Sequence, residues 1–126
     1  MTALRYLLAS LFALNGLAML CLPARWYAAV PGVVDTGPFN PHFVRDVGAA
    51  YLLCGLAYLA LGRAPAAARP WALAGAAFLL AHAALHLAEA LGGLQPLEHL
   101  LADLPAVFVL PLLAAWSAWR APRAVP

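Results

Sequence analysis

Long runs of apolar residues alternate along this chain with shorter segments that hold most of its prolines and arginines. At about 1.5 Å of rise per residue, a helix formed by any of the runs crosses a hydrocarbon layer of about 30 Å. None of them shows the alternation of apolar and polar positions that a barrel strand requires. The pattern therefore predicts four transmembrane helices, at residues 4–22, 44–61, 71–91 and 97–119.

Prolines and glycines mark the expected ends of these helices. The first connection, residues 23–43, holds four prolines and two glycines, and Pro65 and Pro70 bracket the second connection. Gly92 and Gly93 follow the third run in the manner of a C-terminal cap. The two prolines inside the last run predict a kink within the span, because neighbouring helices can satisfy the carbonyls that a proline frees.

The composition assigns the chain to the membrane proteins. Hydrophobic residues make up 66% of the 126 residues, charged residues make up 10%, and the mean hydropathy is +0.87. Soluble domains are about 45–50% apolar, and a chain of this size cannot hide so much additional apolar surface from water. We expect one all-α domain over residues 1–126, an integral membrane four-helix bundle.

The arginines predict the orientation of this bundle. If the four helices alternate in direction, only Arg25 and Arg45 fall on the side opposite the termini. Cytoplasmic flanks carry the excess of positive charge, so both termini are expected in the cytoplasm of a multi-pass protein of the bacterial inner membrane. The net charge of +2 reflects this orientation and gives no support to nucleic acid as a partner. The five arginines on the side of the termini are Arg5, Arg63, Arg69, Arg120 and Arg123.

Histidines and acids gather in three short clusters at the ends of the predicted spans. Within each cluster the residues are four or seven positions apart, so they share one face of a helix. The predicted topology brings all three clusters to the outer half of the membrane, where we expect them to surround one centre. Asp35 and Glu98 are the acids outside the clusters. The clusters are His42 and Asp46, then His82, His86 and Glu89, then His99 and Asp103.

This combination of side chains predicts a metal site. Imidazoles and carboxylates on facing helices enclose transition metals, and ligands without a thiolate fit zinc, iron, copper or manganese. Seven candidates exceed the need of one ion, so some carboxylates are expected to orient a histidine instead of binding the metal. His86 is the preferred ligand, because it has the expected common depth and shares its face with His82 and Glu89. A structural polar network, a proton relay and a haem b held by two histidines are the alternatives.

Two kinds of function are compatible with such a site. One is a metal-dependent membrane enzyme acting on a lipophilic substrate, which enters beneath the first connection lying as a lid over the outer face. The other is a non-enzymatic metal-binding or accessory subunit of a larger membrane complex. Membrane lipid is expected to surround the helix bundle. Gly48 and Gly55 on the second helix permit close helix contacts, within the chain or in a homo-oligomer.

Three stretches of the chain resemble a known group of membrane proteins. They are LNGLAMLCLPARWY, then PFNPHFVRDVGAAYLLCGLAYLALG with its R-D-x-G-x-A-Y segment, and then a third helix led by tryptophan. This layout is similar to the DoxX-like group of small four-helix bacterial membrane proteins, some of which have been linked to respiratory or thiol metabolism. The resemblance implies the fold alone, because the histidine clusters are not a general feature of that group.

Overall fold

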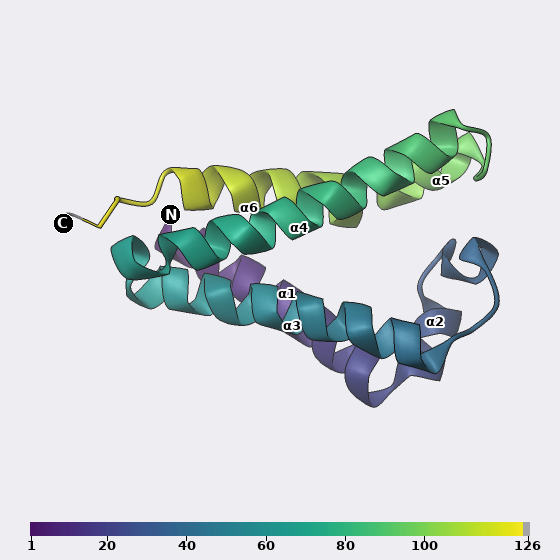
Figure 1. Cartoon of the computed structure of the whole chain (residues 1–126), viewed down its shortest axis with the longest axis horizontal. Coiled ribbons are helices and arrows are strands. Elements are labelled where there is room, and N and C mark those ends of the chain that lie inside the picture. The colour runs from purple at the N-terminus through teal and green to yellow at the C-terminus, as the bar shows by residue number, and fades with distance from the viewer. Residues whose placement is uncertain (125–126) are drawn as a thin grey trace.

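The computed structural model describes residues 1–124, with the backbone but not the side chain of residue 97, and this part of the chain is almost entirely helical (Figure 1). Positions 125 and 126 of the expected domain lie outside the described residues. The fourth long stretch is continuous but has three parts: α5 (Leu97–Asp103), a π-helical turn η2 (Leu104–Val109) and α6 (Leu110–Trp119). The other three long helices are α1 (Thr2–Cys21), α3 (Pro41–Arg63) and α4 (Pro65–Leu91).

All four long stretches are apolar enough and long enough to cross a membrane. Large apolar side chains remain exposed along them, among them Leu14, Leu53, Trp71 and Leu112. A protein in water would bury such side chains, whereas lipid tails accept them at no cost. The fold is therefore the predicted all-α bundle, with the features of a multi-pass membrane protein.

The helices form two antiparallel pairs, which meet at one end of the molecule and diverge toward the other (Figure 1). One pair is α1 with α3, the other is α4 with the α5–α6 stretch, and α3 packs on α4 to join them. Both termini lie at the end where the pairs meet. At the diverging end, the first connection forms the short helix α2 (Pro23–Ala29) and the 3-10 turn η1 (Val33–Thr36).

Glycines bring α1 and α3 into backbone contact. A Cβ added at Gly55 would lie 2.6 Å from the amide nitrogen of Ala13, and one added at Gly16 would lie 2.6 Å from the carbonyl oxygen of Gly48. No side chain fits at these positions, so the helices approach as closely as small-residue interfaces allow. The close contact expected at Gly48 and Gly55 is present, and it lies within one chain.

The closed end of the bundle holds a buried arginine. Arg5 is only 5% exposed, and its Nη2 donates a hydrogen bond of 3.3 Å to the carbonyl oxygen of Ser117 on α6. Leu8, Tyr58 and Leu61, which belong to the hydrophobic core of the bundle, are fully buried. The first and last helices are thereby held together where the two pairs meet, and the other end is free to diverge.

The start of the third span differs from the sequence-based expectation. α4 begins at Pro65 and runs through Pro70, so Ala64 alone separates it from α3, and the predicted start at residue 71 is wrong. Proline is favoured at the first position of a helix, and Pro70 lies only five residues further on. The backbone carbonyl that Pro70 leaves without a hydrogen-bond donor is so near the helix end that water or polar lipid headgroups can reach it. The missing hydrogen bond is therefore tolerated.

The end of α4 follows the expectation, and the last span changes to a π-helical turn at the first of the two prolines for which the sequence predicts a kink. The amide of Leu94 donates to the carbonyl of Glu89, and that of Gly93, whose φ is +71°, donates to Ala90, which is the paired pattern of a Schellman cap. In the last span, the π-helical turn η2 begins directly after Asp103 and contains Pro105. A proline has no amide to donate and crowds the preceding turn, so the widened turn accommodates it.

Candidate functional site in the diverging half of the bundle

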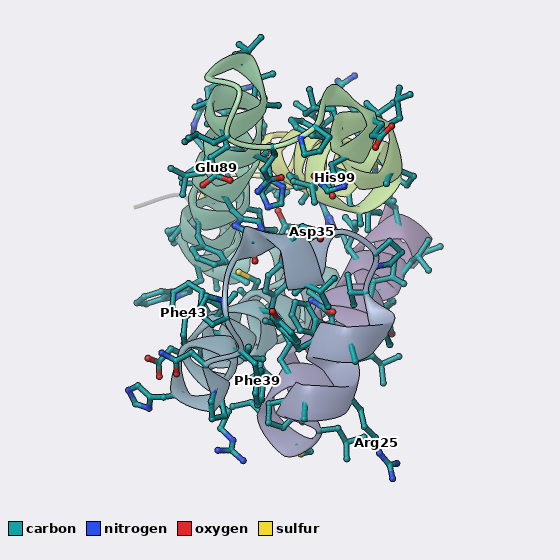
Figure 2. All side chains as sticks on the ribbon, turned by 90° about the vertical axis from the view of Figure 1, so that its right-hand side faces the viewer. Arg25, Asp35, Phe39, Phe43, Glu89 and His99 are labelled. Carbon is teal, nitrogen blue, oxygen red and sulfur yellow. The ribbon has the colours of Figure 1, made fainter. Side chains whose placement is uncertain are left out.

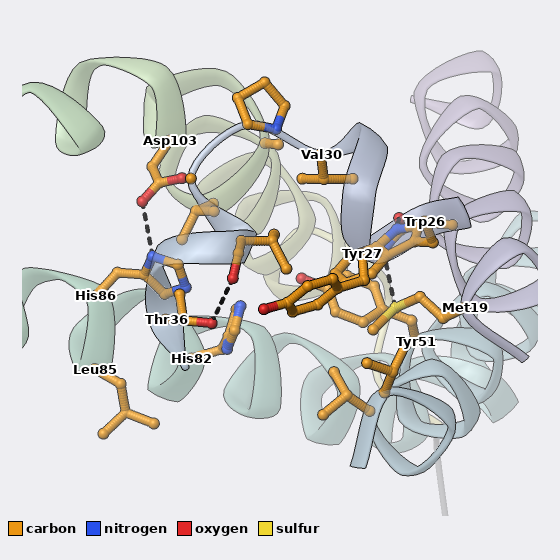
Figure 3. Close-up of a pocket in the computed structure, with 18 of the residues that line it drawn as sticks. Met19, Trp26, Tyr27, Val30, Thr36, Tyr51, His82, Leu85, His86 and Asp103 are labelled. Carbon is orange, nitrogen blue, oxygen red and sulfur yellow. Dashed lines mark hydrogen bonds and ion pairs between the residues drawn. The ribbon is translucent and has the colours of Figure 1, made fainter. Parts of the chain in front are cut away.

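A pocket of about 590 Å³ lies between the two helix pairs (Figure 3). Its walls come from α1, α3, α4 and the stretch from α5 to the start of α6, and the first connection closes over it. Most of the lining is apolar or aromatic, including Phe12, Val47, Tyr51 and Leu110. The divergence of the pairs therefore creates a cavity large enough for a small organic molecule, whose known sites are about 300–1,000 Å³.

Among the described residues that line this pocket, His86 and Asp103 form the shortest hydrogen bond between two side chains. The Nδ1 atom of His86 is 2.7 Å from Oδ2 of Asp103, and both side chains are about four-fifths buried (Figure 3). With Asp103 ionised and His86 neutral, the carboxylate accepts the proton on Nδ1, which assigns the tautomer of the ring. The Nε2 atom then carries a lone pair, available to a ligand or to a proton.

His82 lies one turn before His86 on α4. The two ring centroids are 4.7 Å apart at an angle of 71°. The His82 ring also meets Tyr51 edge-on at 6.2 Å and stacks on Phe78 at 6.4 Å. His82 is therefore part of an aromatic wall and presents a second imidazole beside the first.

His99 connects the cover of the pocket to α5. Its Nε2 atom is 3.6 Å from Oδ2 of Asp35, which belongs to η1 in the first connection. Gly32 lies against the same ring, and its φ of +78° is a conformation that glycine adopts without strain. The first connection thus lies over the histidines, where the sequence analysis placed it.

Two aromatic side chains hold the first connection in this position. Trp26 donates a hydrogen bond of 2.9 Å from Nε1 to Oδ1 of Asn15 on α1. The hydroxyl of Tyr27 donates to the backbone carbonyl of Gly37, further along the same connection. All four residues line the pocket. These contacts could not be predicted from the sequence, because an irregular connection has no period that determines which way its side chains face.

The first predicted cluster lies outside the pocket. The side chains of His42 and Asp46 are 86% and 63% exposed, and they contact each other at 3.4 Å. On α3 the pocket is lined by Phe43, Val44, Val47 and Tyr51, whose positions are about 100–200° around the helix from His42. The expectation that all three clusters meet was wrong for this one, since shared depth does not ensure a shared face.

The remaining candidates all line the pocket. Glu89 accepts a hydrogen bond of 2.8 Å from the amide of Gln95, and it stands beside the smaller hollow that also contacts Asp35. His82, His86, Glu89, His99 and Asp103 thus surround one space. Within residues 1–124, however, no three histidines, cysteines or acids stand in an arrangement that could hold a metal ion. Two of the imidazoles face a carboxylate instead.

Comparison with known proteins does not assign this chain to a family. No family model matches the chain, and no curated protein or solved structure matches it either. The DoxX-like resemblance therefore stays a prediction from the sequence. The function has to be argued from the pocket itself.

Proposed function

We propose that this protein binds a lipophilic small molecule in the pocket, and that His86, oriented by Asp103, exchanges a proton with it. The observation that carries the proposal is the 2.7 Å contact between these two side chains at the edge of a cavity with apolar walls. Ionisable groups inside a membrane bundle are costly, so their presence at a cavity favours a role in binding or proton transfer.

The chemistry follows from the way the pair is arranged. A carboxylate on Nδ1 holds the imidazole in one tautomer, and it stabilises the imidazolium that forms when Nε2 takes a proton. A hydroxyl or amine on a bound molecule would donate to this Nε2. The same pair serves a proton relay or an acid-base step in an enzyme, and both uses require that a ligand occupies the pocket.

Binding can be measured with the lipophilic fluorescent amine 1-aminoanthracene and the protein in lipid nanodiscs. We expect saturable fluorescence above that of empty nanodiscs. A Val47→Trp variant fills the pocket and should lose the saturable part, while Leu53→Trp adds the same ring at a lipid-facing position of α3 that is 67% exposed. Equal binding by the two variants, or none by the parent, would contradict the proposal.

Metal binding is the second candidate, and the short distance between the rings of His82 and His86 favours it. Two imidazoles one turn apart on a helix can share an ion if water or a ligand completes its coordination. On this account the purified protein contains zinc, iron, copper or manganese, and His82→Ala and His86→Ala each remove most of it. Elemental analysis decides, and a metal-free parent that takes up none of the four ions on titration rules this candidate out. A haem between two histidines has no such support, since these rings lie on the same helix.

We place the pocket at the outer face of a bacterial inner membrane, with both termini in the cytoplasm. The arginine asymmetry and the position of both termini at one end of the bundle support this topology. In a variant without Cys21 and Cys54, a cysteine at Thr36 should react with a membrane-impermeant maleimide added to whole cells. A cysteine at Ala66 should react only after permeabilisation, and the reverse pattern would overturn the orientation.

The DoxX-like resemblance belongs to the proposal as well, supported by the helix layout alone. An accessory role in a larger membrane complex would use the same pocket to bind a ligand without turning it over. Loss of the saturable signal in Val47→Trp tests the pocket in either case.

A further inference from the structure

The polar end of the pocket is acidic and lacks a permanent positive charge. Three of the five acids in the chain line the pocket or the hollow beside it: Asp35, Glu89 and Asp103. All seven arginines lie in the described part of the chain, and none of them lines either space. At the open end of the bundle, Asp35 lies near His99 and Glu89, whereas Arg25 points away from them (Figure 2).

The histidines do not compensate for all of this charge. His86 can share a proton with Asp103, and His99 can share one with Asp35. Glu89 contacts only the neutral amide of Gln95, and within residues 1–124 no basic side chain lies at ion-pair distance from it. His82 is unsuited to balance it, because its ring is 4.7 Å from that of His86 and two imidazolium ions so close repel each other.

Aromatic rings surround the rest of the pocket. Trp26, Tyr27, Phe12, Phe43 and Tyr51 all line it, and they come from three different elements of the fold, α1, α2 and α3. The face of an aromatic ring attracts an organic cation, most strongly where water is excluded. Carboxylates at one end and aromatic faces along the walls are the two features by which proteins recognise a lipophilic ammonium group.

We propose that the ligand of this pocket is a lipophilic organic cation, an amine or ammonium compound whose charged end lies toward Glu89 and Asp103 and whose apolar part lies among the aromatic rings. This inference rests on the proposed function, since it names the class of molecule that the pocket takes. A carboxylate or phosphate ligand would meet the acids Asp35, Glu89 and Asp103 there with no arginine to bind it, and a neutral alcohol would leave the charge of Glu89 unbalanced.

Displacement of 1-aminoanthracene by three eight-carbon compounds tests the inference, because they differ only in the head group. We expect octylammonium to displace the probe at a concentration at least about tenfold lower than octanol, and octanoate to be the weakest. Glu89→Gln should reduce the preference for octylammonium over octanol several-fold. Glu98→Gln, the same charge change at an exposed residue outside the pocket lining, should leave it unchanged.

The possible results distinguish a failure of the cationic-ligand inference from a failure of the proposed function. If octanol and octylammonium displace the probe equally, or if Glu98→Gln acts like Glu89→Gln, the cationic ligand is wrong and the lipophilic pocket stands. If octanoate is the best competitor, the ligand is an anion and the inference is again wrong. If the probe never binds saturably to the parent protein, the proposed function fails together with the inference.

Discussion

Replacing His86 with alanine is expected to weaken the binding of 1-aminoanthracene by about twofold to tenfold, while the protein stays folded and monodisperse. The amine of the probe would lose the Nε2 acceptor, and Asp103 would lose its partner at 2.7 Å. A hydrogen bond between neutral groups contributes about 0.5–1.5 kcal/mol, and tenfold corresponds to about 1.4 kcal/mol, so the expected loss is about twofold to tenfold. Fluorescence titration in nanodiscs, with size-exclusion chromatography of the same sample, measures both quantities.

Asp103→Asn is a more specific test than His86→Ala, because the side chain of asparagine has nearly the same shape as that of aspartate. The amide oxygen of asparagine can still accept from Nδ1 of His86, so the ring keeps its place but loses the neighbouring negative charge. We expect weaker binding than in the parent and stronger binding than in His86→Ala. A variant that binds as the parent does would show that the carboxylate has no part in the site.

Replacing Gly55 with leucine is expected to disrupt the bundle itself. The first added carbon would lie 2.6 Å from the backbone nitrogen of Ala13 and 2.8 Å from its Cβ atom, and neither can move without shifting α1. Overpacking costs about 1–3 kcal/mol when a side chain can adjust, and here backbone stands in the way. At about 4–8 °C per kcal/mol, the melting temperature should fall by more than about 10 °C, or the protein should fail to purify as one species.

Ala60→Leu is the control for this variant, since it creates the same leucine side chain, with three added carbons in place of four, on the exposed face of α3. It should melt within a few degrees of the parent. Gly55→Ala adds one methyl group at the contact and should fall between the two. If Gly55→Leu melts like Ala60→Leu, then α1 and α3 do not approach each other as closely as the glycine contacts require.

The helices were accessible from the sequence because length and hydropathy decide them. An apolar run of about twenty residues has one stable form in lipid, the α-helix. The Schellman cap at Gly93 and the close helix contact at Gly48 were also predictable, because glycine is strongly preferred at both kinds of position. The start of α4 was placed too late, since a proline such as Pro70 reads as a helix end unless its position relative to the first turn is known.

The site was only partly accessible. Depth along the spans correctly brought His86 and Asp103 together, although they are 17 positions apart in the sequence. Depth says nothing of rotation about the helix axis, and for that reason His42 was wrongly assigned to the same centre. The contacts of Asp35 with His99 and of Trp26 with Asn15 depend on how an irregular connection folds back, which neither helical period nor hydropathy encodes.

Photolabelling with 1-azidoanthracene, followed by mass spectrometry of the digested protein, tests the central claim most directly, because it reports where a lipophilic molecule resides. The account predicts attachment within the pocket lining, at Trp26, Tyr51 or their neighbours, and loss of this labelling in Val47→Trp and in excess 1-aminoanthracene. Labelling confined to lipid-facing positions such as Leu53 and Leu112, unaffected by the competitor, would contradict it.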